Sequence, residues 1–145
     1  MAITSAICTS FKQELLVGTH NFTATTGNTF KIALYTSSAT LGAGTTAFTT
    51  SNEITNTSGT AYTSGGATLT SVTPTTDSTT AVCDFADVSF TSASFTANGA
   101  LIYNDTQSDK AVAVIAFGGD KTVSSGTFTI QFPTADATNA IIRLA

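Results

Sequence analysis

The sequence predicts an all-β protein, an antiparallel β-sandwich or jelly-roll-like fold with about eight strands and one short N-terminal helix. Three observations support this class. Short segments rich in β-branched and aromatic residues recur at roughly 8–12-residue spacing, separated by Gly, Asn, Asp and Ser. Threonine, which favours extended backbone, is the commonest residue. The sequence lacks the long helical patterns, alternating with strands, that a doubly wound sheet requires.

Residues 1–22 are predicted to form an extended arm, residues 1–9, followed by the one helix. Ser10 and Gln13 fit a capping box, in which each side chain bonds the backbone amide of the other residue. Gly18 is a typical helix stop because glycine adopts positive φ without strain. A helix of about two turns is not stable alone, so we expect it to dock on the rest of the chain.

A strand is predicted over Thr29–Tyr35, with Phe30, Ile32 and Leu34 on one face. The stretch after it, Thr36–Gly66, is a long loop rich in Thr and Gly and poor in apolar residues. A structureless loop of this length is unusual in a compact domain. It is therefore expected to carry function, to pack on a neighbouring subunit, or to contain a short strand or helical turn.

The stretch Asn98–Gly119 is predicted to be the centre of the fold. Its two apolar runs, Ala100–Tyr103 and Ala111–Phe117, read as the strands of a hairpin. The second run is apolar throughout, so both of its faces should be covered. A turn is expected after it, from Gly118 to Lys121. The remaining strands are predicted at Ala67–Val72 (stopped at Pro74), Thr79–Phe85, Asp87–Phe90, Ser92–Ala97, Thr127–Phe132 and Ala140–Leu144.

The composition argues against several classes of protein. A chain of 145 residues is expected to form one domain. Charged residues make up 10% of it, against a usual ~25%. Five basic residues and a net charge of −4 argue against nucleic acid as a partner. No apolar run is long enough to cross a membrane, and the first residues lack the basic start of a secretion signal.

No catalytic motif is present. His20, the only histidine, would have to serve any Ser-His-Asp site, but no G-x-S-x-G motif accompanies it, so we interpret it as structural or surface-exposed. Asp84 and Asp87 flank an expected bulge and need not share a face. The sequence therefore predicts no enzyme.

No cofactor or metal site is predicted either. The segment Asn104–Asp109, NDTQSD, lacks the central Gly and final Glu of an EF-hand loop, so it favours a turn over an ion site. Cys8 and Cys83 are interpreted as free, buried thiols, with a disulfide as the alternative.

Some apolar residues lie in segments with few core positions. They are expected to contact a partner, although packing within the chain is the open alternative. These candidates are Phe11, Leu15, Phe22, Leu41, Phe48, Ile54 and Tyr62.

Five segments carry a family resemblance: SFKQELLVGTHNF, TFKIALYTSSATL, GALIYND, KAVAVIAFGGDK and GTFTIQFP. In this order they resemble small virion structural proteins of tailed bacteriophages. The resemblance runs from about Ser10 to Arg143. It implies a non-enzymatic role as a capsid decoration or cement protein, which binds the major capsid protein and bridges capsomers.

The resemblance also implies a homo-oligomer, with a trimer as the expected form, on the capsid surface of a virion made in the host bacterial cytoplasm. Two other function classes are weighed against this one. A tail, neck or host-recognition module would bind a cell-surface glycan or protein. A hydrolase would need a catalytic site that the sequence does not offer.

Overall fold

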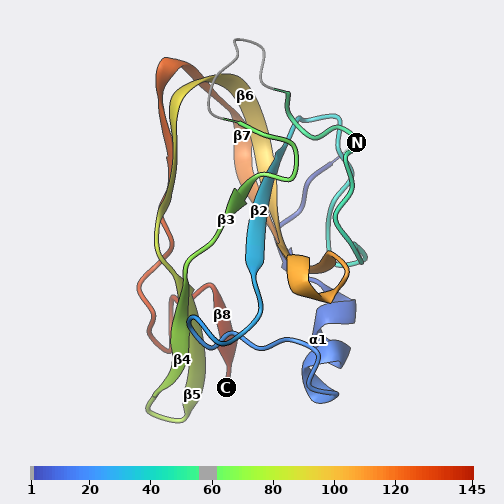
Figure 1. Ribbon diagram of the computed structural model, residues 1–145. Coiled ribbons are helices and arrows are strands. Elements are labelled where there is room, and N and C mark those ends of the chain that lie inside the picture. Colours follow the sequence, from blue (N-terminus) through green and yellow to red (C-terminus); the bar gives the residue numbers. More distant parts are fainter. Residues whose placement is uncertain (1, 56–61) are drawn as a thin grey trace.

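The computed structural model describes residues 2–55 and 62–145 of the chain (Figure 1). Strands dominate the described residues, and the one α-helix lies near the N-terminus. The elements are β1 (Ala6–Ile7), α1 (Thr9–Leu16), β2 (Phe30–Tyr35), β3 (Ala67–Thr68), β4 (Ser71–Asp77), β5 (Thr80–Phe85), β6 (Val88–Asn104), the 3₁₀ turn η1 (Asp105–Gln107), β7 (Lys110–Ile130) and β8 (Ile142–Leu144).

The strands form two antiparallel sheets, which confirms the predicted all-β class. The larger sheet has the order β1-β7-β6-β2-β3, and the smaller one has the order β4-β5-β8. Buried residues of both sheets belong to one hydrophobic cluster, so the arrangement is sandwich-like. No helix in the described part of the chain is long and apolar enough to cross a membrane.

The predicted central hairpin is confirmed. Strands β6 and β7 pair from Asn104 and Lys110 outward, with η1 as the connection. In the apolar run Ala111–Phe117, residues 111–114 are buried, as the prediction of two covered faces requires, whereas residues 115–117 are only half-buried. Strand β2 lies on the other side of β6 and is buried on both faces except at Lys31.

The separate short strands predicted on either side of this hairpin are wrong in their boundaries. They merge into two long strands, β6 with 17 residues and β7 with 21. The turn expected from Gly118 is instead a bend within β7, where Gly118 and Gly119 have φ of 75° and 144°. Register shifts interrupt the pairing of β6 with β7, and such bulges bend a strand without ending it.

This bending folds the β6–β7 ribbon back on itself (Figure 1). The rings of Phe117 and Phe128 lie 6.0 Å apart although both belong to β7. Eleven residues of straight strand would separate them by roughly 36 Å. The two halves of one ribbon therefore face each other across the apolar interior.

The predicted strand stop at Pro74 is also wrong. Strand β4 continues through Pro74 to Asp77, with a register shift between Val72 and Thr75. Proline lacks an amide hydrogen but is tolerated at a sheet edge, and β4 is an edge strand.

The helix begins two residues earlier in the chain than predicted, with Cys8 in place of Ser10 as its N-cap and no side-chain cap. The capping box at Ser10 is wrong, and the Ser10 hydroxyl is buried without a hydrogen-bond partner. The cause is the pairing of the chain with β7 just before the helix. The amide of Cys8, which follows β1, donates to the carbonyl of Val112 at 3.0 Å, and this bond fixes where the chain turns. The predicted stop is confirmed, since Gly18 has φ of 76°.

The long loop after β2 packs on the core of its own chain. Its described part contains isolated bridges, Tyr35 with Glu53 and Ala47 with Lys110, but no helix or longer strand. The predicted loop range includes residues 56–61, which lie outside the described residues, as does Met1 of the predicted arm.

Candidate functional site

The seven residues expected to contact a partner are covered by the chain itself. Phe11, Phe22, Leu41, Ile54 and Tyr62 are buried, and Leu15 and Phe48 are partly buried against the core. Packing within the chain, the alternative that the sequence left open, therefore accounts for the position of these side chains.

Aromatic stacking explains where these side chains go. Phe22 stacks on Phe30 with ring centroids 4.2 Å apart and planes 8° from parallel. Phe48 stacks on Tyr103 at 4.7 Å. Rings this close bury large apolar areas and favour such offset or tilted contacts, so packing within the chain accounts for the isolated anchors of the N-terminal third.

A buried polar network surrounds His20, which lies under the helix. Its Nε2 is 2.6 Å from Oε2 of Glu14, and its Nδ1 is 2.9 Å from Nδ2 of Asn104. Asn104 is fully buried and also donates to Oδ1 of Asn28 at 2.9 Å. Lys110 Nζ lies 3.6 Å from the other oxygen of Glu14.

The hydrogen bonds assign the state of the imidazole. The Asn104 carbonyl oxygen accepts from the backbone amide of Gln107 at 3.2 Å, which orients the amide group. The amide nitrogen then donates to His20 Nδ1, so the ring is neutral with its proton on Nε2, facing the Glu14 carboxylate. Both ring nitrogens are engaged in the fold, which supports the structural interpretation of His20.

Glu53 forms a second buried connection, between the long loop and the sheet. Its carboxylate accepts from the Tyr62 hydroxyl at 2.6 Å, the Ser64 hydroxyl at 2.8 Å and the Gly65 amide at 2.6 Å. Burial, and then the hydrogen bond to Glu53, raise the pKa of the Tyr62 hydroxyl. Tyr62 in turn accepts from the amide of Leu34 in β2, so this carboxylate fastens the loop to the core.

The NDTQSD tip is confirmed as a turn. Asn104 caps η1, and the Thr106 hydroxyl accepts from the Thr29 amide at 2.8 Å. No group of three or more His, Cys, Asp or Glu in the described part of the chain is placed to hold a metal ion. The carboxylates of Asp84 and Asp87 accept backbone amides, those of Phe85 and Phe132.

Both cysteines are free thiols, so the disulfide alternative is wrong. Burial raises the pKa of the Cys8 and Cys83 thiols to about 11. For Cys8 the negative charge of Glu14 adds to this effect. A thiol held neutral in this way is a poor nucleophile.

The exposed large apolar side chains lie at other positions than those predicted. Leu16 and Val17 at the end of α1 are 88% and 72% exposed, and Val72 and Leu144 are about half exposed. A helical wheel of the predicted helix contains this signal, because three consecutive apolar residues, Leu15 to Val17, cannot all face one side.

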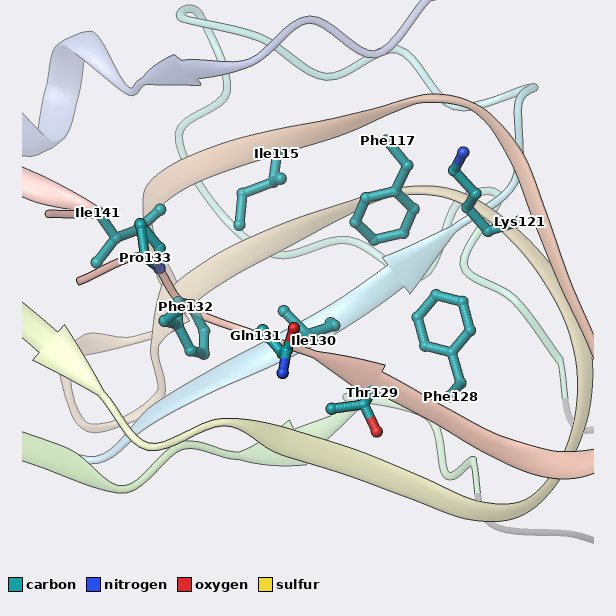
Figure 2. A pocket seen from close by; sticks show the side chains of 10 residues that line it. All are labelled: Ile115, Phe117, Lys121, Phe128, Thr129, Ile130, Gln131, Phe132, Pro133 and Ile141. Atoms are coloured by element: carbon teal, nitrogen blue, oxygen red, sulfur yellow. The ribbon is translucent and has the colours of Figure 1, made fainter. Parts of the chain in front are cut away.

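An apolar groove opens between the two halves of β7 (Figure 2). We call it the β7 groove, and its volume is about 460 Å³. Figure 2 shows Ile115 and Phe117 on one half of the strand opposite Phe128 and Ile130 on the other. It is lined by Ile115, Phe117, Lys121, Phe128, Thr129, Ile130, Gln131, Phe132, Pro133 and Ile141.

Comparison with protein families, with curated proteins and with solved structures finds no match for this chain.

Proposed function

We propose that this chain is a structural virion protein that decorates a capsid shell and stabilises it by bridging capsomers. The observation that carries the proposal is the exposed apolar pair Leu16–Val17, at the end of a helix that is packed on the core through its buried side. The anchor is the buried Phe11 ring, which lies 4.8 Å from the imidazole of His20. Such a helix end presents a small, rigid apolar contact.

The surface around this contact suits repeated packing on a shell. Only 10% of the residues are charged, and the polar exposed positions are mostly Thr and Ser. A surface with little charge packs against a neighbour with a small desolvation cost. The buried residues His20 and Glu53 and the partly buried Glu14 connect segments of the fold, which supports a mechanical role.

A single contact of this size is weak, so the proposal requires multiple copies. Full burial of a Leu or Val side chain contributes about 1.5–3 kcal/mol, and most of this offsets the entropy lost on association. A homotrimer on a capsid symmetry axis would multiply the contact through effective concentration. The partner in this proposal is the major capsid protein.

The test is the number of copies per particle. Quantitative mass spectrometry of purified particles, with labelled peptides of this chain and of the major capsid protein as standards, gives the ratio of the two. Hundreds of copies per particle are expected of a shell protein. A dozen copies or fewer would contradict capsid decoration and favour the tail, neck or host-recognition role. A cryo-EM map of the same particles would then locate the chain.

A further inference from the structure

The β7 groove is apolar inside and has one charged side chain, Lys121. Six of the ten lining residues are Ile or Phe, and the polar remainder apart from the lysine is Thr129 and Gln131. Clefts of roughly 300–1,000 Å³ with apolar walls and a few placed polar groups are typical ligand sites. At about 460 Å³ the groove lies within this range.

The strand register places Lys121 on the inward face of the ribbon. Lys121 lies opposite Ala97 of β6, and Ala97 is fully buried. Residues directly opposite in an antiparallel pair share a face. The next residue, Thr122, points outward, where its hydroxyl bonds that of Thr96 at 2.8 Å. Lys121 therefore lies on the groove side of the ribbon, at the end of the groove, where its side chain is exposed to solvent.

No carboxylate of the described residues forms an ion pair with Lys121. The ion pairs found there both involve Glu14, with His20 and with Lys110. The neighbouring Asp120 accepts a hydrogen bond from the Asn98 side chain at 2.9 Å. This solvent-exposed ammonium at the rim of the groove can donate a charge-assisted hydrogen bond to a negatively charged group.

The two ends of the groove limit the size of an occupant. Figure 2 shows Pro133 and Ile141 at one end and Lys121 at the other, where β7 bends. An occupant of this space has an apolar body between the Phe and Ile side chains and its charge at the Lys121 end.

We propose that the β7 groove binds an amphiphilic carboxylate, a small molecule with an aliphatic body and one negative charge. The aliphatic body packs between Phe117 and Phe128, and the carboxylate accepts a hydrogen bond from the Lys121 ammonium. This proposal is independent of the virion role, because it concerns the isolated chain. The competing explanation is that Lys121 is an exposed charge on β7 that only prevents edge-to-edge aggregation of this strand.

The test is a titration of the isolated chain, with Ile methyl groups labelled for NMR, against octanoate. Octanol and octyltrimethylammonium are the matched probes, with the same alkyl chain and no negative charge. The methyl signals of Ile115, Ile130 and Ile141 should shift on saturation, while that of Ile32, buried on the far strand β2, should not. Octanoate should bind more tightly than both other probes, and added salt should weaken octanoate binding alone.

The Lys121→Gln variant should weaken octanoate binding about fivefold, as expected for one exposed charge pair, and leave octanol binding unchanged. Lys12→Gln, on the exposed face of α1, is the matched control and should change neither. Equal binding of the three probes, or no effect of Lys121→Gln on octanoate, would overturn the proposal. The absence of any shift in the Ile methyl signals of the groove would also overturn it. If the Lys121→Gln variant then forms concentration-dependent dimers, the role of Lys121 is to prevent aggregation of β7.

Discussion

Individual buried polar residues connect segments that are far apart in the sequence. Asn104 at the end of β6 bonds His20 after the helix and Asn28 before β2. Glu53 likewise connects distant parts of the long loop, because its carboxylate accepts from Tyr62 and Gly65. A buried polar group that loses its partner costs about 1–3 kcal/mol, so each connection has a measurable effect on stability.

Replacing Asn104 with alanine tests the first connection. We expect Asn104→Ala to lower the free energy of unfolding by about 3 kcal/mol, because the His20 ring and the Gln107 amide both lose a buried partner. Urea denaturation followed by circular dichroism measures the change. Asn98→Ala in the same strand is the control, since its bond to Asp120 is exposed and should contribute less than about 1 kcal/mol. Equal effects of the two variants would contradict the assigned role.

The two thiols predict a loss of stability at alkaline pH. Burial raises the pKa of Cys8 and Cys83 from 9.0 to about 11. The unfolded chain therefore releases these protons at lower pH than the folded chain does. Their contribution to stability is complete below pH 9 and is lost as the pH rises toward 11.

Urea denaturation at intervals between pH 8 and about 9.5 measures this loss, because tyrosines stay largely protonated there in the unfolded chain as well as in the folded one. The double variant Cys8→Ala/Cys83→Ala should show a flatter pH dependence than the natural chain, whatever its absolute stability. Identical slopes would show that the thiols do not titrate differently on folding.

At the scale of the elements, the sequence predicts local pattern and fails where distant packing decides. The alternation of Thr127–Phe132 is confirmed, with Phe128, Ile130 and Phe132 less exposed than Thr129 and Gln131 between them. Period-2 alternation depends only on which face is covered. The fold class and the central hairpin follow from signals of the same local kind.

Local sequence signals could not predict that the short strands merge into β6 and β7. Gly118 and Gly119 are typical of both turns and bulges, and only pairing with β6 distinguishes the two. The packing of the expected contact residues within the chain could not be predicted for a similar reason. Whether an isolated ring such as Phe48 is exposed depends on whether Tyr103, far along the chain, lies beside it.

Gly66 shows how closely two elements approach, at the start of β3 beside β2. A Cβ atom on Gly66 would lie 1.8 Å from the Ile32 carbonyl oxygen, and its φ is 80°. Both the clash and the positive φ oppose a side chain, so we expect Gly66→Ala to cost at least ~3 kcal/mol.

Gly44→Ala is the matched control for this substitution. A Cβ atom there meets nothing within 4 Å, and φ is not positive. Its effect should lie within about 0.5 kcal/mol of zero. Thermal unfolding of both variants measures the difference, and comparable melting temperatures would contradict the close packing of β3 on β2.

At the scale of the whole molecule, the folded-back β6–β7 ribbon is part of the larger sheet, and α1 lies on the outside of the two sheets (Figure 1). The ribbon supplies strands to the larger sheet and continues from β5 of the smaller one. The helix end is then a fixed feature of a stiff body, which is the property that a bridging contact between capsomers requires.

This arrangement predicts how the chain reinforces a particle. Adding the purified chain to particles that lack it should raise the temperature at which they release their DNA, measured by the fluorescence of a DNA-binding dye. Leu16→Asp/Val17→Asp should abolish the rise, because carboxylates at the contact would have to be desolvated. Both side chains are exposed, so the isolated variant should unfold at nearly the same temperature as the natural chain. Gln13→Ala, at another exposed position of α1, should reinforce particles normally. Full reinforcement by the double aspartate variant would show that the shell is bound through another surface.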